Sequence, residues 1–337
     1  MREFVWVGAN NDYDRIQQRS EANQMQNVCF CEGPDKRLKG LARLFYKLHT
    51  SETSNKLFSL PFKAVWAPSI LDKKTKKYLK TVPPQDICFL FCSKSYGYRQ
   101  LKTFRYLRKK YKNCKIVYLF NDTYRHYSRI YPTMNLQSLA SDFDCILTYN
   151  KKDADEYGFL LYPPKLRDYS QVKENAELAP CDLFFIGREK GRLDKILEVY
   201  SFCKEKGLAC DFHIVGVDTD KQRFADEISY NKPMSYEQVL THVKRAHAIL
   251  NIVQEDAEGI TLRDYEAIAM NKVLITNNPV LLASDFYTEE KVVRLEGIGC
   301  EWEKIKNADE RTCWKGQDVY TVEKWYAWLE NQIETKN

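Results

Sequence analysis

The stretch Asn251-Ile-Val-Gln-Glu-Asp-Ala-Glu258-Gly259-Ile-Thr261-Leu-Arg263-Asp-Tyr-Glu266-Ala-Ile-Ala-Met270 joins an apolar strand to an amphipathic helix through an acidic loop. Gly259 allows the backbone to approach a ligand closely. Thr261 is a good N-cap, and the free amides at the start of its helix form an anion site. Arg263 follows in the first turn, where the helix dipole disfavours a cation. A bound anion would resolve that conflict.

Glu266 lies five residues beyond Thr261, which is roughly 7.5 Å along a helix axis. That distance is close to the separation between a diphosphate and the ribose hydroxyls of one nucleotide. A carboxylate there is a natural acceptor for two vicinal hydroxyls. The same spacing fits a solvated helical face equally well, with Asp264 or Glu258 as ion-pair partners of Arg263.

A second stretch, Leu183-Phe-Phe-Ile-Gly187-Arg188-Glu-Lys190-Gly191-Arg192, predicts a buried strand, a turn bounded by two glycines and a helix. Its three cations, Arg188, Lys190 and Arg192, could neutralise a diphosphate leaving group. The stretch matches neither the G-x-G-x-x-G fingerprint nor the G-x4-G-K-[ST] phosphate loop, so those classes are disfavoured. An ordinary charged turn is the alternative.

Short apolar runs alternate with amphipathic stretches along most of the chain, which is typical of βαβ units in a mostly parallel sheet. Continuously apolar strands predict burial on both faces of the sheet. The predicted strands are Phe4–Val7, Phe62–Trp66, Ile87–Cys92, Lys115–Phe120, Cys145–Tyr149, Asp182–Ile186, Cys210–Val215, Ala248–Val253 and Lys272–Thr276. The predicted helices are Arg37–His49, Tyr98–Tyr111, Arg192–Lys206, Tyr236–Ala246 and Leu262–Met270.

The alternation of predicted strands and helices is interrupted once, at Leu160-Leu-Tyr-Pro-Pro-Lys165 and the polar connector that follows it to residue 180. Two prolines and a polar connector before a fresh strand indicate a domain boundary. We therefore predict an α/β fold of two doubly wound parallel-sheet domains, facing across a cleft. The domains are residues 1–165 and 166–320, and a helix within 321–337 packs on one of them through Trp325, Trp328 and Leu329.

The net charge of +6 hides an asymmetry between the two halves. Residues 1–165 hold 29 Lys+Arg against 15 Asp+Glu, a net of +14, whereas residues 166–337 hold 23 against 31, a net of −8. The basic residues of the first half are densest in residues 73–80 and 105–112, where aromatic side chains lie among the cations. Such patches fit nucleic acid, an anionic membrane surface or an ordinary solvated helix face.

Nucleic acid is not expected as a partner, because no helix-turn-helix, zinc-finger or RNP-like signature accompanies the basic patches. An anionic phospholipid surface would attract them by about 1 kcal/mol per basic residue. No apolar run approaches the roughly 20 residues that span a bilayer, and the N-terminus lacks the apolar core of a signal peptide. We therefore expect a cytoplasmic protein, with possible peripheral attachment to the inner membrane face.

The eleven cysteines are scattered, and no C-x-x-C occurs, which favours a reduced compartment and makes a zinc site improbable. Two D-x-D triplets, Asp153-Ala-Asp155 and Asp218-Thr-Asp220, could suggest a metal. Such triplets are common by chance, and both are expected to be surface charge. No metal or other cofactor is predicted.

The two quoted stretches together resemble the nucleotide-sugar domain of GT-B glycosyltransferases. The spacing from Glu258 to Glu266 is E-x7-E, and the segment after Glu266 is similar to that family's E-A-x-A-x-G-x-P-V-I continuation. The nearest resemblance is to bacterial transferases that build capsule and lipopolysaccharide chains. Their F-I-G-R-x-K-G-R, D-F-x-I-V-G-V and N-K-P-x-S-Y-E-x-V-L segments have counterparts at Phe185–Arg192, Asp211–Val217 and Asn231–Leu240. The likeness covers roughly 100 residues of the second half.

The resemblance implies that Glu266 holds the ribose of a nucleotide-diphosphate-sugar donor and that Glu258 contacts the donor sugar. It places the loop Tyr230–Met234 near the base. The residues expected to bind the donor are Arg188, Lys190, Arg192, Gly259, Ile260, Thr261, Arg263, Glu266 and Lys232. GT-B transferases characteristically need no bound metal, because helix amides and cations neutralise the leaving group. The chain departs from the family pattern at two places: Asn271-Lys272-Val273 replaces G-x-P, and Ile260-Thr261 replaces an aromatic–glycine pair.

The first half should then hold the acceptor. A catalytic base must reach the acceptor hydroxyl, and Asp12, Asp122 or His126 in the loops after strands could do so, besides Glu258. Asp122 and His126 fit structural, capping or surface roles equally well. The expected activity is transfer of a sugar to a glycan or lipid-linked acceptor in capsule or lipopolysaccharide synthesis. The alternatives are a sugar-nucleotide epimerase of related fold and a non-catalytic protein that binds polyanions or membranes.

Overall fold

The structure is a computed structural model that describes residues 2–8, 12–51, 61–170, 172–254, 259–307 and 311–335. The chain divides into two compact units. Unit 1 is Met1–Pro164 together with Val322–Asn337, and unit 2 is Lys165–Thr321. Each unit contains a six-stranded sheet whose paired strands are all parallel, so the predicted α/β fold with two parallel-sheet domains is confirmed.

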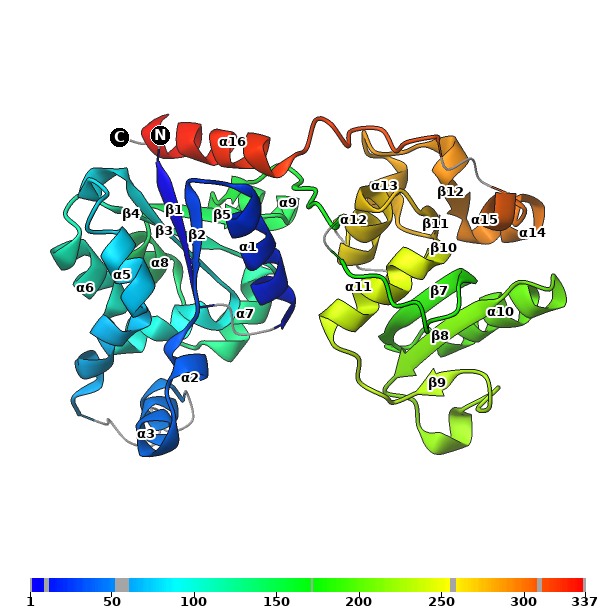
Figure 1. Cartoon of the computed structure of the whole chain (residues 1–337), viewed down its shortest axis with the longest axis horizontal. Helices are drawn as coiled ribbons and strands as arrows, with labels where there is room; N and C mark the ends of the chain where they lie inside the picture. Colours follow the sequence, from blue (N-terminus) through cyan, green and yellow to red (C-terminus); the bar gives the residue numbers. More distant parts are fainter. Residues whose placement is uncertain are drawn as a thin grey trace. The chain divides into compact units, whose positions relative to one another are not determined.

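The sheet of unit 1 has the order β2-β1-β3-β4-β5-β6, with its first strand inside the sheet (Figure 1). Its strands are β1 (Glu3–Val7), β2 (Val28–Cys31), β3 (Ile87–Cys92), β4 (Lys115–Leu119), β5 (Cys145–Thr148) and β6 (Leu160–Leu161). Its helices are α1 (Asp12–Gln24), α2 (Pro34–Arg37), α3 (Gly40–Thr50), α5 (Lys73–Tyr78), α6 (Thr103–Lys110), α7 (Tyr124–Ile130), α8 (Leu136–Asp142), α9 (Lys151–Tyr157) and α16 (Val322–Thr335), with 3-10 turns η1 (Lys63–Ile70), η2 (Pro84–Asp86) and η3 (Ser93–Leu101).

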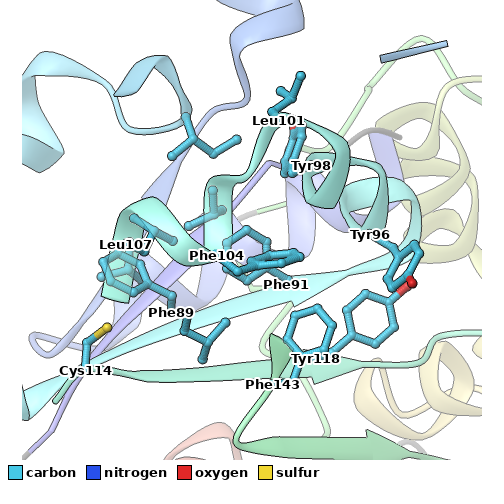
Figure 2. Packing of buried hydrophobic residues seen from close by; sticks show 14 of the residues in the cluster. Phe89, Phe91, Tyr96, Tyr98, Leu101, Phe104, Leu107, Cys114, Tyr118 and Phe143 are labelled. Atoms are coloured by element: carbon cyan, nitrogen blue, oxygen red, sulfur yellow. The ribbon is translucent and has the colours of Figure 1, made fainter. Parts of the chain in front are cut away.

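One face of this sheet carries an aromatic core. Alternate residues of a strand point to opposite faces, and Phe89 and Phe91 of β3 point to the side covered by α6 and η3 (Figure 2). Phe91 meets Phe104 of α6 edge-on, with ring centroids 5.0 Å apart. Phe104 in turn packs against Phe143, at 4.7 Å. Edge-to-face packing of this kind adds stability beyond the burial of apolar area.

The opposite face of the same sheet is covered by α16, which arrives from the far end of the chain. Trp325, Tyr326 and Leu329 of α16 pack on Phe4, Trp6 and other residues of that face. Trp6 Nε1 donates to the Tyr326 hydroxyl at 2.6 Å, and that hydroxyl donates to the carboxylate of buried Glu21 at 2.6 Å. The last helix therefore completes the core of unit 1.

The sheet of unit 2 has the order β12-β11-β10-β7-β8-β9. Its strands are β7 (Cys181–Arg188), β8 (Cys210–Val215), β9 (Ser229–Tyr230), β10 (Ala246–Asn251), β11 (Val273–Thr276) and β12 (Val292–Arg294). The chain builds outward from β7 to β9 and then crosses back to place β10 on the other side of β7. Strand order therefore reverses between β7 and β10, the position at which open α/β sheets bind ligands.

Helices cover both faces of this second sheet. They are α10 (Leu193–Glu205), α11 (Tyr236–Arg245), α12 (Leu262–Ala269), α13 (Pro279–Leu282), α14 (Ile298–Glu301) and α15 (Lys304–Asn307), with 3-10 turns η4 (Thr219–Lys221), η5 (Glu289–Lys291) and η6 (Leu295–Gly297). α10 packs on the face that carries Leu183 and Phe185. α11 packs on the other face, where its His242 stacks on Phe184 with ring centroids 5.4 Å apart.

The strand predicted at Phe62–Trp66 is wrong, because most of that segment begins the 3-10 turn η1. Phe62 has a left-handed backbone (φ 59°) and Pro68 lies within η1, so an extended strand cannot continue there. The run is not buried either, since Phe62 is 80% exposed. The place beside β1 is taken by β2, a four-residue Val-Cys-Phe-Cys run that periodicity did not reveal.

Two predicted helices are interrupted. Arg37–His49 separates into α2 and α3, with Leu38 and Lys39 extended between them. Tyr98–Tyr111 separates into η3 and α6 at Lys102, whose φ is 55°. All eleven cysteines lie in the described part of the chain and are free thiols. No described helix is long and apolar enough to cross a membrane.

Replacing Leu329 with alanine tests whether α16 is part of the core of unit 1. Leu329 is 0% exposed, and the cavity left behind should lower the free energy of unfolding by about 2–5 kcal/mol. Urea denaturation followed by tryptophan fluorescence measures the change. Asn331→Ala, at an exposed position of the same helix, is the control, and an equal effect of the two variants would contradict the packing described.

Candidate functional site

A pocket of about 300 Å³ lies at the carboxyl ends of β7 and β10, where the strand order of unit 2 reverses. The end of each strand and the start of α12 form its wall. It is lined by Phe185, Ile186, Gly187, Lys190, Arg192, Leu250, Asn251, Ile252, Val253, Gln254, Thr261, Leu262 and Arg263. Four of the predicted donor-binding residues therefore meet here: Lys190, Arg192, Thr261 and Arg263.

Lys190 reaches the pocket from a strained turn. It follows β7 with a left-handed backbone (φ 42°), a conformation that costs a non-glycine residue about 1–3 kcal/mol. Its exposed ammonium is 3.4 Å from Gln254 Oε1. A non-glycine residue held in this conformation beside a pocket is a candidate for a functional role.

Arg192 forms the wall between the two strand ends. Its Nε donates to the carbonyl of Glu189 at 3.2 Å, its Nη2 to the carbonyl of Arg188 at 2.5 Å and its Nη1 to the carbonyl of Ile252. Burial lowers the pKa of its guanidinium. Arg192 thus ties the end of β7 to the segment after β10 and brings a positive charge to the pocket wall.

The other predicted donor-binding residues lie around the pocket rather than on its lining. Arg188 is exposed at the last position of β7, and Gly259 and Ile260 are half-buried just before α12. Lys232 is exposed in the loop between β9 and α11. Glu258 lies outside the described residues.

The buried carboxylate of Asp264 holds the pocket edge together. It is 0% exposed and accepts hydrogen bonds from Asn251 Nδ2 at 2.6 Å, the Thr261 amide at 2.7 Å and Asn278 Nδ2 at 2.7 Å. Asn278 also donates to the carbonyl of Gly259, at 3.1 Å. Burial raises the pKa of Asp264 against the effect of these hydrogen bonds. One carboxylate thereby joins the end of β10, the start of α12 and the segment after β11.

Glu266 is also fully buried, and its Oε2 accepts a hydrogen bond from Arg263 Nη1. Burial raises the pKa of Glu266, while the Arg263 guanidinium and the Tyr236 hydroxyl act to lower it. This ion pair places the Glu266 carboxylate beside Arg263, the cation in the first turn of α12. Arg263 is therefore neutralised internally, and Glu266, which is 0% exposed, does not line the pocket.

A larger pocket of about 400 Å³ lies beside the ends of β7 and β8, but its charge does not suit a phosphate. Four carboxylates line it: Glu189, Asp194, Asp218 and Asp220. Its two cations are engaged, Lys221 with Asp218 and Arg223 with Asp194, each at 2.9 Å. The pocket between β7 and β10 is therefore the better anion site.

Of the two D-x-D triplets, the second matches the expectation of surface charge, and the first matches it at exposed Asp155 but not at Asp153. Asp218 and Asp220 are exposed. Asp153, expected to be surface charge, is 6% exposed and accepts a hydrogen bond from the Tyr124 amide at 2.7 Å. Its position in the first turn of α9 turns the carboxylate inward, toward the start of α7.

In unit 1, Asp122 and His126 lie together after β4. Their side chains are 49% and 51% exposed, and Asp122 Oδ2 is 3.8 Å from His126 Nε2. Asp122 also accepts from the Thr123 amide at 2.7 Å. Asp12 is the first residue of α1, and its side chain lies outside the described part of the chain. The structure brings Asp122 and His126 together and leaves both accessible.

A group of buried polar side chains at the same edge of unit 1 was not predicted from the sequence. Asp14 of α1 is 4% exposed and accepts from Asn121 Nδ2 at 3.2 Å. Gln18 Nε2 donates to Cys92 Sγ at 3.2 Å, and the Cys92 thiol points to Asp14 at 3.8 Å. Asn121 and Cys92 stand at the ends of β4 and β3, so only the sheet brings them to α1.

A further cluster joins Asp211 and His213 of β8 to His242 of α11. Asp211 Oδ1 is 2.7 Å from His213 Nε2, and Oδ2 is 2.6 Å from His242 Nδ1. The three side chains offer ligand atoms within 4.8 Å of one another, enough in number for a metal ion with open positions. Asp211 is the second residue of β8, so the cluster lies toward the amino end of the sheet, away from the pocket.

Comparison with known proteins supports the fold. No model of a known protein family matches the chain, and no curated protein is significantly similar in sequence. Trehalose-6-phosphate synthase is similar in structure, with a TM-score of 0.57, 11% identity and 99% of each chain covered. Sucrose-phosphate synthase from Thermosynechococcus elongatus gives 0.54, 11% and 100% of each chain. An alpha-glucosyltransferase solved with UDP and a 13-mer DNA gives 0.54 and 12%, covering 99% of this chain and 100% of that one.

These neighbours are glycosyltransferases of the GT-B type. Because the similarity extends over essentially the whole of each chain, the two units together have the GT-B fold, as the sequence resemblance predicted. At identities of 11–12%, the similarity establishes the fold alone.

Replacing Asp264 with alanine should disrupt the edge of the pocket. It leaves the Thr261 amide and two buried amide side chains without their acceptor, so we expect a loss of about 3 kcal/mol in the free energy of unfolding. Chemical denaturation measures it. Asp194→Ala is the control, because that side chain is 99% exposed, and stability equal to the wild type in Asp264→Ala would contradict the role given to this carboxylate.

The Asp211 cluster predicts acid sensitivity. Burial raises the pKa of Asp211, but its hydrogen bonds and charge interactions with His213 and His242 prevail and hold the pKa below the ordinary 3.8. A carboxylate with a depressed pKa contributes stability above its unfolded pKa and loses that contribution as the pH falls through the folded value. Stability measured at successive pH values below about 4 should therefore decline less steeply in Asp211→Asn than in the wild type. Parallel profiles would contradict this prediction.

Proposed function

We propose that the protein is a glycosyltransferase that moves a sugar from a nucleotide-diphosphate-sugar donor to an acceptor. One observation carries the proposal: Lys190, Arg192, Arg263 and the capped start of α12 converge on one pocket at the strand-order reversal of unit 2. The GT-B fold of the whole chain supports it. An epimerase of related fold remains the alternative enzyme, and the need for an acceptor distinguishes the two.

The proposed chemistry follows from the charge of the pocket. Breaking the bond between sugar and diphosphate leaves negative charge on the departing nucleotide. Oriented cations and the amides at a helix start stabilise that charge without reorganising. Lys190 is the most available of the three cations, because Arg192 is bonded to backbone carbonyls and Arg263 to Glu266.

Arg263 and Glu266 would act as a coupled pair in this proposal. A bound diphosphate competes with Glu266 for the Arg263 guanidinium. When Arg263 turns to the phosphates, Glu266 is released to accept the ribose hydroxyls, as the sequence resemblance implies. The raised pKa of the Glu266 carboxyl marks a charge that burial makes costly, so a ligand that supplies two hydroxyl donors would offset part of that cost.

Unit 1 would hold the acceptor, with Asp122, His126 or Asp12 as the base that receives the proton of the acceptor hydroxyl. A glycan or lipid-linked acceptor of capsule or lipopolysaccharide synthesis fits the net charge of +14 over residues 1–165, because an anionic membrane would attract this half. α5 and α6 carry the densest parts of that excess.

DNA is the second acceptor class to consider. It is favoured by the same basic excess and by the structural similarity to an alpha-glucosyltransferase that was solved with UDP and DNA. Transfer assays with a nucleotide-sugar donor and, in separate reactions, duplex DNA and lipid-linked glycans distinguish the two acceptor classes. Sugar incorporated into one class only assigns the acceptor.

Donor binding is tested by thermal shift with UDP, GDP and CMP and with their sugars. A nucleotide at 100 times its dissociation constant should stabilise the folded protein by about 2.7 kcal/mol. The absence of any shift with every nucleotide, up to millimolar concentrations, would overturn the proposed function. Arg188→Ala and Glu266→Gln should each weaken the nucleotide that binds, and an unchanged affinity would remove the corresponding residue from the donor site.

Lys190→Gly separates ligand binding from stability. Glycine adopts the left-handed backbone of position 190 without strain, so we expect the free energy of unfolding to be unchanged or higher. Loss of a charge-assisted contact should weaken nucleotide binding about tenfold or more. Lys221→Ala, at a cation of the acidic pocket, is the matched control. Equal affinity in Lys190→Gly and wild type would exclude Lys190 from the site.

A further inference from the structure

The helix α3 carries an apolar stripe that faces solvent. Leu41, Leu44, Phe45 and Leu48 have the i, i+3, i+4, i+7 spacing of one helix face. Their exposed fractions are 73%, 54%, 54% and 40%. In a helix of a globular protein such a stripe normally packs on the core. In α3 the buried residue is Tyr46, on the side away from the stripe.

The contacts of α3 fix this orientation. Tyr46 packs edge-on against Trp66 of η1, with ring centroids 5.5 Å apart. Trp66 Nε1 donates to His49 Nδ1 at 2.7 Å. α3 also packs against η3. The helix is thus held by the face opposite the stripe. Two further apolar residues at the start of η1, Phe62 and Val65, are also exposed.

Cations accompany the stripe without any acidic residue. Lys39, Arg43 and Lys47 are exposed, and no Asp or Glu occurs between residues 36 and 51. At about 100° per residue, Lys47 lies about 60° from Leu44 at the edge of the stripe, and Arg43 lies about 100° from Leu44 on the same flank. Long basic side chains at that position can reach phosphates while the apolar face is immersed. Apolar residues on one side and cations at the flank are the pattern of a helix lying in the interface of an anionic membrane.

We infer that α3 docks unit 1 on an anionic lipid bilayer, with Leu41, Leu44, Phe45 and Leu48 inserted below the headgroups and with Arg43 and Lys47 on lipid phosphates. Charge alone fits lipid and nucleic acid equally. Four large apolar side chains gain nothing from a phosphate backbone, and protein–DNA interfaces are polar and positively charged. The stripe therefore favours lipid.

The place of α3 in the fold suits this role. It follows β2, so it lies at the carboxyl-end edge of the sheet, as does α7 after β4 (Figure 1). η3 follows β3 and the loop with Asp122 follows β4, so both belong to the same edge. A lipid-linked acceptor would reach that edge directly from the bilayer. In this respect the inference rests on the proposed function, although lipid binding itself is measured without donor or acceptor.

The test is cosedimentation of the full-length protein with vesicles of phosphatidylcholine, with or without phosphatidylglycerol. The wild type should bind the anionic vesicles, and less so at high salt. Leu44→Ala/Phe45→Ala should lower the partition coefficient by about tenfold or more. Arg43→Gln/Lys47→Gln should lower binding to anionic vesicles and leave the weak binding to neutral vesicles unchanged.

Matched controls change equivalent residues elsewhere on unit 1. Ile130→Ala/Leu136→Ala removes two exposed apolar side chains from α7 and α8, and Lys151→Gln/Lys152→Gln removes two charges from α9. Both control variants should bind vesicles like the wild type. The melting temperature of each variant, measured with and without nucleotide, reports whether the variant is folded and whether it binds the donor. A variant that loses vesicle binding but keeps the nucleotide shift would therefore contradict neither donor binding nor the proposed transfer activity.

Four results would overturn the inference. The first is that the wild type fails to bind anionic vesicles, and the second is that the control variants lose as much binding as the α3 variants. The third is a dimer, detected by light scattering, that Leu44→Ala/Phe45→Ala abolishes; the stripe would then be a protein interface. The fourth is that the α3 variants lose binding to duplex DNA while no variant and no wild-type protein binds vesicles; the surface would then bind nucleic acid.

Discussion

The buried Asp264 carboxylate accepts hydrogen bonds from the end of β10, the start of α12 and Asn278 after β11. A carboxylate without solvent is costly unless its oxygens are bonded, so these three segments are constrained to meet. That constraint sets the position of Thr261 and Arg263 at the pocket, and through Asn278 it also fixes the carbonyl of Gly259. The shape of the pocket between β7 and β10 therefore depends on this junction.

The cations of the pocket differ in what else they bind. Arg192 donates its hydrogen bonds to backbone carbonyls and so forms part of the pocket wall. Arg263 donates to the Glu266 carboxylate. Lys190 makes one long contact to Gln254 and stands on a strained backbone. A ligand phosphate would therefore meet one available cation and one that must exchange partners. Lys190 and Arg263 thus differ in how readily each could turn to a bound anion.

Two amphipathic helices of unit 1 differ in where their apolar faces lie: that of α16 is buried, and that of α3 is exposed. α16 turns Trp325, Tyr326 and Leu329 onto the sheet, and its Tyr326 hydroxyl satisfies buried polar groups of the N-terminal segment. α3 turns its apolar stripe outward, because Tyr46 and its partner Trp66 hold the other face. The same periodicity in sequence thus serves core packing in one helix and an exposed surface in the other.

The sequence by itself determined the two-sheet fold, since apolar runs and helical periodicity are local signals, and it identified the turns that carry Lys190, Arg192, Thr261 and Arg263. The sequence predicts the four-residue strands β5 and β11 but not β2, β9 and β12, which have two to four residues and therefore little periodicity. Only the tertiary structure decided that Asp264 is the hub of the site, because its partners Asn251 and Asn278 lie 13 and 14 residues away in the chain. It also decided that Glu266 is buried against Arg263 and that the stripe of α3 faces outward. Whether a side chain is buried, and which group it bonds to, depends on how helices pack on the sheet. The spacing of residues along the chain does not contain that information.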